Sequence, residues 1–204
     1  MEEFKNELKK IPVTAVLLFL NLAVFLLADF TGGSENTSHM VACGASYTPL
    51  ILEEGEWYRL FTAMFLHFGI THLGNNMLVL FVLGQRLEPA IGKIRYLLIY
   101  LLSGLGGNAL SLYGELASGD FSVSAGASGA VFGIMGAMLY VLILCKGRLQ
   151  DLTARQVLVM AAFSLYFGFT SSGVDNWAHV GGLVCGFLAA LLLVRKPSRL
   201  RQAP

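Results

Sequence analysis

Apolar residues gather in six runs along the chain, separated by polar segments. The runs cover residues 11–30, 62–83, 94–113, 123–145, 153–171 and 177–194. A helix needs about 20 apolar residues to cross the hydrocarbon core of a bilayer, and each run comes close to that length. The pattern therefore predicts an all-α, polytopic membrane protein whose six transmembrane helices form one bundle.

The polar segments between the runs show how the helices connect. Residues 84–93, 114–122, 146–151 and 172–176 have the length of ordinary connectors. The first segment, residues 31–60, is longer, and we expect it to carry structure of its own. Because the runs use nearly the whole chain, we expect a single membrane-embedded domain over residues 1–204, with a short segment before residue 11 and a tail from residue 195.

The composition agrees with a membrane protein and gives no sign of a polyanionic partner. The chain is 55% hydrophobic and 13% charged, which is unusual for a soluble domain of 204 residues. A net charge of +1 gives no indication of nucleic acid as a partner. Cys43, Cys145 and Cys185 lack CxxC or metal-ligand spacing, so we expect free thiols and no cofactor.

The first apolar run follows Lys9 and Lys10 and is too long for the hydrophobic part of a secretory signal. We expect it to be a retained helix. Basic residues near span ends stay in the cytoplasm, and here all but Arg59 fall on one side of the predicted topology. Both termini are therefore expected in the cytoplasm. The basic residues of that side are Lys5, Lys9, Lys10, Arg86, Lys93, Arg95, Lys146, Arg148, Arg155, Arg195, Lys196, Arg199 and Arg201.

A glycine-framed serine opens the fourth run in the sequence Gly126-Ala127-Ser128-Gly129. Further glycines follow at 133 and 136. Small residues at this spacing often serve only to pack membrane helices closely. The serine becomes a candidate nucleophile only if a base lies beside it.

The sixth run offers such a base in Ala178-His179, followed by Gly182 and Gly186. In the predicted topology His179 and Ser128 lie near the same face of the membrane. A neutral imidazole within about 3 Å of a serine hydroxyl accepts its proton. The other interpretation is a buried hydrogen-bonding histidine. No acid is positioned by the sequence to complete a triad.

The start of the second run carries His67, His72 and Asn76. His72 and Asn76 are four residues apart and so share one helix face. Both can donate hydrogen bonds to an oxygen that becomes negative during acyl transfer. The alternative is a metal site made of His67, His72 and His179. We expect no metal, because no carboxylate or thiolate joins these histidines in the second run and the HExxH pattern is absent.

Together these motifs resemble the rhomboid family of intramembrane serine proteases over nearly the whole chain. The resemblance implies that Ser128 is the nucleophile and His179 the general base. It implies an oxyanion hole of His72, Asn76 and the Ser128 backbone N–H. The supporting residues it implies are His67, Gly126, Gly129, Phe132 and Gly182, and Gly84-x3-Glu88-x3-Gly92 resembles a further family pattern that serves structure.

Two positions depart from the family pattern. Phe132 stands where many relatives have a tyrosine that stacks on the histidine, so the ring is kept and the hydroxyl is lost. The first long loop reads Trp57-Tyr58-Arg59 where Trp-Arg is common. Aromatic residues there anchor at lipid headgroups, and Arg59 either reaches phosphates or satisfies loop carbonyls.

The resemblance implies cleavage of transmembrane protein substrates near the outer face of the membrane, with a small residue before the cut. The compact six-span form resembles prokaryotic members of the family, so we expect a bacterial cell membrane, with the lipid bilayer as a partner and no oligomeric state assigned. Two rival hypotheses remain open. One is a catalytically silent rhomboid-like protein that binds membrane clients. The other is a small transporter, although the sequence has no internal repeat.

Overall fold

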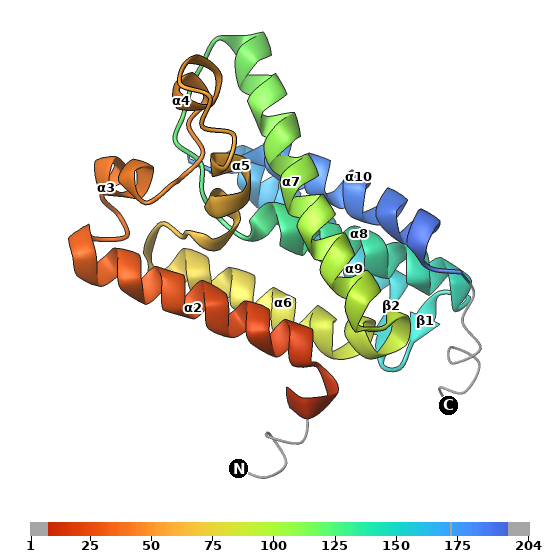
Figure 1. Cartoon of the computed structure of the whole chain (residues 1–204). Coiled ribbons are helices and arrows are strands. Elements are labelled where there is room, and N and C mark those ends of the chain that lie inside the picture. The colour runs from red at the N-terminus through yellow and green to blue at the C-terminus, as the bar shows by residue number, and fades with distance from the viewer. Residues whose placement is uncertain (1–7, 172, 196–204) are drawn as a thin grey trace.

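The computed structural model describes residues 8–171 and 173–195, and the predictions for Lys5, Lys196, Arg199 and Arg201 fall outside them. The described chain is almost entirely helical, as predicted (Figure 1). A two-stranded hairpin, β1 (Arg148–Leu149) and β2 (Leu152–Thr153), joins two of the helices. The long helices are α2 (Pro12–Gly32), α6 (Gly69–Ile91), α7 (Lys93–Ser118), α8 (Ser128–Leu144), α9 (Ala154–Thr170) and α10 (Asn176–Leu193).

The long helices correspond to the six predicted runs, although their lengths differ. Among the described residues α2, α7 and α10 are each long and apolar enough to cross a membrane. A fourth span is broken: residues Arg59–Phe65 and α6 meet at an angle of 89°. Helices α8 and α9 have 17 residues each, so they rise about 25 Å, a little less than the hydrocarbon core.

The predicted boundaries of the second run were wrong. The run was expected at 62–83, but α6 starts at Gly69 and continues to Ile91 through the predicted connector. Leu83, Leu87 and Ile91 are buried at four-residue spacing, so packing extends the helix past its polar residues. Gly92 alone separates α6 from α7, and its φ of +89° is a conformation that favours glycine.

The boundary before α8 also differs from the prediction. Residues 123–127 were expected inside the fourth run, but α7 extends to Ser118 and α8 begins only at Ser128. The residues before Ser128 form a loop instead, in which Ser124 forms an antiparallel bridge with Ser46. Val123, Ala125 and Ala127 gave this loop the apolar character that the sequence pattern assigned to a helix.

The long first loop has structure of its own, as expected, and Arg59 holds it together. It contains α3 (Thr37–Ala42), α4 (Thr48–Glu53), α5 (Arg59–Thr62) and the 3-10 turn η1 (Ala63–Phe65). The Arg59 guanidinium is buried, donates to the carbonyls of Val41 and Ala45, and pairs with Glu56 at 2.5 Å. Of the two roles considered for Arg59, the structure shows the bonding to loop carbonyls.

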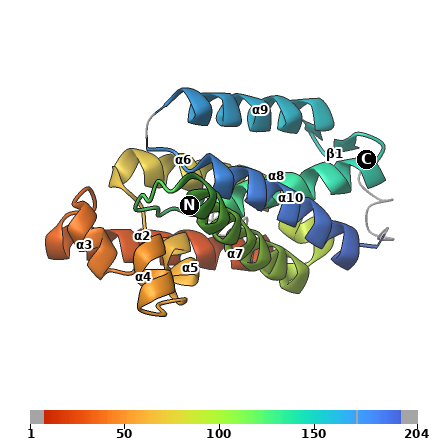
Figure 2. The ribbon, with the colours of Figure 1, turned by 90° about the horizontal axis from the view of Figure 1, so that it is seen from above.

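Helix α8 lies at the centre of the bundle. Its residues are buried on every side from Gly129 to Met138, and it packs against α6, α7, α9 and α10. In the view from above, α9 lies at one edge of the bundle, while α2 lies toward the opposite side (Figure 2). Ser128 is therefore the first residue of the most enclosed helix.

Glycines bring α8 and α10 into backbone contact. A Cβ atom on Gly182 would overlap the carbonyl oxygen of Gly129, and one on Gly186 would overlap that of Gly133. Gly136 faces the backbone of Leu183 in the same way. Side chains larger than hydrogen would push the two helices apart, so the glycines fix their separation.

A buried carboxylate caps the start of α2. Glu88 of α6 is 1% exposed, and its oxygens accept the backbone N–H groups of Val13 and Thr14 at 2.9 and 2.8 Å and the Thr14 hydroxyl at 2.7 Å. Ile11, at the N-cap, offers no side-chain cap. Glu88 thus satisfies N–H groups that a helix start leaves unpaired, which gives the Gly84-x3-Glu88-x3-Gly92 pattern a structural role.

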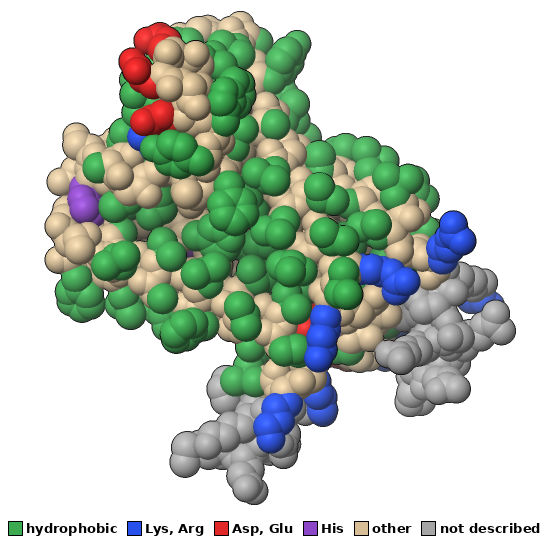
Figure 3. Space-filling model, in the orientation of Figure 1, with side chains coloured by type: hydrophobic (Ala, Val, Ile, Leu, Met, Phe, Trp, Pro, Cys, Tyr) green, Lys and Arg blue, Asp and Glu red, His purple; other side chains and the backbone are tan. Residues whose placement is uncertain are grey.

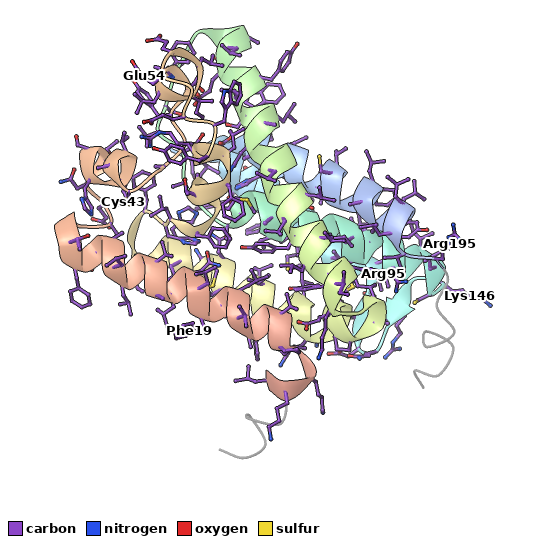
Figure 4. The ribbon with its side chains drawn as sticks, viewed as in Figure 1. Phe19, Cys43, Glu54, Arg95, Lys146 and Arg195 are labelled. Atoms are coloured by element: carbon purple, nitrogen blue, oxygen red, sulfur yellow. The ribbon has the colours of Figure 1, made fainter. Side chains whose placement is uncertain are left out.

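Most acidic and most basic side chains of the visible surface lie at opposite ends of the bundle. Apolar side chains are spread over the visible surface, with acidic side chains gathered beside α4 and most of the basic ones at the far end (Figure 3). Glu54 marks the first end, and Arg95, Lys146 and Arg195 mark the second (Figure 4). We call these the acidic end and the basic end.

The helix contact predicts that Gly186→Ala destabilises the protein. The added methyl group has no space against Gly133, so we expect a loss of about 2 kcal/mol in the free energy of unfolding. The matched control is Gly74→Ala, because Gly74 is helical and nothing lies within 4 Å of a Cβ atom there. Unfolding in mild detergent measures both, and equal stability of the two variants would contradict the contact.

The buried cap predicts that Glu88→Ala destabilises the protein by about 3 kcal/mol, because it leaves buried N–H groups of α2 unpaired. The control is Asp151→Asn, which breaks an exposed pair with Arg86. Hydrogen bonds from Arg86 lower the pKa of Asp151 from its usual value, so the contribution of this pair is present near neutral pH and is lost only in acid. Near neutral pH we expect Asp151→Asn to change the unfolding temperature little. An equal effect of both variants argues against the cap.

Candidate active site

The turn before Ser128 is fixed by bonds to the segment that precedes α6. The backbone N–H of Gly126 donates to the Ala63 carbonyl at 2.9 Å, and that of Ala127 donates to His67 Nε2 at 3.3 Å. Gly126 has a φ of +151°, and a Cβ atom there would lie 2.8 Å from His72 Cε1 and 3.5 Å from Ser128 Oγ. The glycine therefore leaves room for the His72 ring beside the Ser128 hydroxyl.

His179 lies in the first turn of α10 and is 8% exposed. Its ring stacks on Phe132, with centroids 4.3 Å apart and planes at 17°. Phe132 follows Ser128 by one helical turn, so the two share a face of α8. The stacking places His179 on the face of α8 that carries Ser128.

The two groups are neighbours without being hydrogen-bonded. Among the described residues no hydrogen bond joins Ser128 Oγ to His179, and the His179 Nδ1 atom is buried without a partner. The carbonyl oxygen of Ala178 would lie 3.4 Å from a Cβ atom on Gly129. Gly129 and Ala178, the neighbours of Ser128 and His179, therefore lie in contact. The hydrogen bond between a nucleophile and its base is often long until a substrate is bound.

The other predicted site residues lie at the same end of the bundle. The rings of His67 and His72 meet edge to face, with centroids 5.1 Å apart. The Asn76 amide donates to the His72 carbonyl at 3.1 Å, so in this structure it is directed to its own helix. Ser128, His179 and His72 each occupy the first turn of a long helix, and all three helices start toward the acidic end.

The alternative of a metal site has no support in the geometry. Over residues 8–171 and 173–195, no three His, Cys, Asp or Glu side chains are arranged to hold a metal ion. Instead, the Nε2 atom of His67 accepts a hydrogen bond from the Ala127 N–H.

Two acidic residues that hold the segments next to the site were not predicted from the sequence. Asp175 and Glu115 are not among the predicted site residues. Asp175 is the N-cap of α10 and accepts the Ala178 N–H at 2.9 Å. Glu115 accepts the N–H and hydroxyl of Ser122 at 3.1 and 2.8 Å. An aspartate directly before the start of an apolar helix was the available signal for Asp175.

Comparison with known proteins identifies the family. Residues 54–196, more than half of the chain, match the family described as Rhomboid domain. The chain is 42% identical over 182 residues to the rhomboid protease GluP of Bacillus subtilis, covering 88% of this chain and 34% of that protein.

Two further relatives match over more of their own length. The chain is 32% identical to the putative rhomboid protease YdcA of Bacillus subtilis, over 97% of this chain and 96% of that protein. It is 33% identical to the rhomboid protease AarA of Providencia stuartii, over 95% of this chain and 76% of that protein. With its six-helix membrane bundle, the chain belongs to the rhomboid family of intramembrane serine proteases.

Proposed function

We propose that this protein is an endopeptidase that cleaves transmembrane protein substrates near the acidic end of the bundle, with Ser128 as nucleophile and His179 as general base. The observation that carries the proposal is the stacking of His179 on Phe132, one turn after Ser128. Backbone contact between α8 and α10 holds this arrangement. A serine beside a neutral imidazole is suited to acyl transfer.

The reaction proceeds in two stages. Ser128 Oγ attacks the carbonyl carbon of the substrate peptide bond while its proton passes to His179. The imidazolium then donates that proton to the leaving amine, the peptide C–N bond breaks, and an ester to Ser128 remains. Water next attacks the ester, His179 accepts the water proton and returns it to Ser128 Oγ, and the acid product leaves.

The start of α8 supports stabilisation of the negative oxygen that forms during attack. The Ser128 N–H belongs to the first turn, where backbone N–H groups lack intrahelical partners and the helix dipole is positive. His72 lies beside the Ser128 hydroxyl and supplies a second donor. Asn76 becomes a third donor if its amide leaves the His72 carbonyl.

The substrate is another membrane protein that presents a locally unwound segment. A helical segment keeps its carbonyls in hydrogen bonds and shields them from attack, so residues that weaken a helix near the end of a span favour cleavage. The separation of basic and acidic ends supports a topology with both termini in the cytoplasm and the site toward the outer face. The bacterial relatives support a bacterial cell membrane as its location.

The proposal predicts that Ser128→Ala and His179→Ala each lower kcat for cleavage of a tagged single-span substrate in liposomes by about 10³-fold or more. Ser118→Ala and His39→Ala are matched controls, since Ser118 is exposed and His39 bonds to Thr31 and Cys43 and not to the dyad, and we expect them to keep native activity. Cleavage that persists in either dyad variant overturns the assignment. A native protein that cuts none of several substrates points instead to a client-binding role.

The stacking of Phe132 on His179 gives a second prediction. Phe132→Ala removes the aromatic contact that orients the imidazole, so we expect kcat to fall by about 10-fold, while Phe132→Tyr keeps the ring and stays near native. Phe19→Ala, on the exposed face of α2, is the control for loss of a large aromatic side chain (Figure 4). Equal kcat for Phe132→Ala and the native protein would show that the stacking does not serve the reaction.

A further inference from the structure

The Asp175 carboxylate lies where three segments of the chain meet. Its Oδ1 atom accepts the backbone N–H of Ala178 at 2.9 Å. Its Oδ2 atom accepts the hydroxyls of Ser111 at 2.5 Å and Ser124 at 2.7 Å. Both carboxylate oxygens are thus used, and their partners come from α10, α7 and the loop of residues 119–127.

Two of these partners lead directly to the candidate dyad. Ala178 immediately precedes His179 in the first turn of α10, and Ser124 lies four residues before Ser128. The third partner, Ser111, is 7% exposed and lies on α7, which packs against both α8 and α10. One side chain therefore joins the segment that leads to Ser128, the turn that carries His179, and α7, which packs against both helices.

Other bonds hold the loop without reaching α10. Ser124 exchanges backbone hydrogen bonds with Ser46 at 2.8 and 2.9 Å, and Glu115 of α7 holds Ser122. Among the hydrogen bonds of residues 8–171 and 173–195, the bond from Ser124 to Asp175 is the one that ties loop 119–127 to α10. The glycine contact between α8 and α10 starts only at Gly129, beyond the nucleophile.

We propose that Asp175 is a positioning residue for the reaction, which sets the placement of His179 relative to Ser128 through its bonds to Ala178 and Ser124. This inference rests on the proposed function. Asp175 acts through the backbone on either side of the dyad and takes no proton itself. Proton transfer requires the hydroxyl and the imidazole within hydrogen-bond reach, and a misplacement of about 1 Å can cost about 100-fold in rate.

The positioning role of Asp175 depends on its hydrogen bonds, so it can be distinguished from an effect of its charge. Asparagine is as good an N-cap as aspartate, and its amide oxygen still accepts the Ala178 N–H. Its NH₂ group can donate to the oxygens of Ser111 and Ser124, whose hydroxyls are free to rotate. Asp175→Asn therefore keeps the links and removes the charge, whereas Asp175→Ala removes both.

The test compares kcat and KM of purified native protein, Asp175→Ala, Asp175→Asn and Ser124→Ala on a tagged single-span substrate in liposomes, well below the unfolding temperature of each variant. We expect Asp175→Ala to lose about 10- to 100-fold in kcat with little change in KM, and Ser124→Ala to lose part of that. Asp175→Asn should stay within about threefold of native. The double variant Asp175→Ala with Ser124→Ala should lose no more than Asp175→Ala alone, because both remove one link. The control is Asp120→Asn, an exposed carboxylate of the same loop, which should keep native kcat.

A second readout reports on the serine without a protein substrate. An alkyl fluorophosphonate bonds through phosphorus to an activated serine oxygen, fluoride leaves, and the proton goes to the imidazole. We expect the rate of this labelling at Ser128 to fall in Asp175→Ala and to recover in Asp175→Asn. If Asp175→Ala folds poorly, Ser124→Ala still tests the inference by both readouts, because it removes the bond to Asp175 and leaves the cap of α10 in place.

The outcomes distinguish this inference from the proposed function. If folded Asp175→Ala retains native kcat and labelling, or if Asp175→Asn is as impaired as Asp175→Ala, positioning by hydrogen bonds is overturned while the dyad stands. If Ser128→Ala still cleaves the substrate, the proposed function itself fails. A rise in KM at constant kcat would also overturn the inference, since it indicates a role in substrate binding.

Discussion

The close approach of α8 and α10 is the constraint on which the rest of this structure depends. In a bilayer the hydrophobic effect does not drive helices together, so association relies on surfaces that fit closely. Glycines on both helices let the backbones touch at Gly129–Gly182 and Gly133–Gly186. With α10 in that position, α8 is enclosed on all sides, and the first turns of the two helices lie side by side.

Polar groups bond to one another at both ends of the bundle. At the acidic end, Asp175, Glu115 and His67 bind the backbone and hydroxyls of the segment that enters α8. At the basic end, Glu88 closes the start of α2 against α6. Glu88 is buried and Asp175 and Glu115 are half-buried, and each accepts several hydrogen bonds, which is the condition under which such a group is tolerated inside a protein. The result is a largely apolar exterior with these carboxylates bonded near helix ends.

The features that could be predicted from the sequence are those set by residues close together along the chain. The six apolar runs and the glycine frames around Ser128 and His179 were visible because helix packing in a membrane depends on repeated small residues. The starts of α6 and α8 were misplaced because Leu66 and Ala127 are apolar yet lie in buried loops. The bonds of Asp175 to Ser111 and Ser124 were out of reach, since these serines are more than fifty residues away along the chain and only the tertiary fold brings them together.

The Glu88 cap bears on how the protein is assembled during synthesis. The amide groups of Val13 and Thr14 find their acceptor 75 and 74 residues later in the chain. When α2 first leaves the ribosome, the carboxylate that closes it has not yet been made, so these groups must remain in water or at the membrane surface. The first turn of α2 therefore lacks its acceptor until α6 lies beside it, so the two helices complete this cap only as a pair.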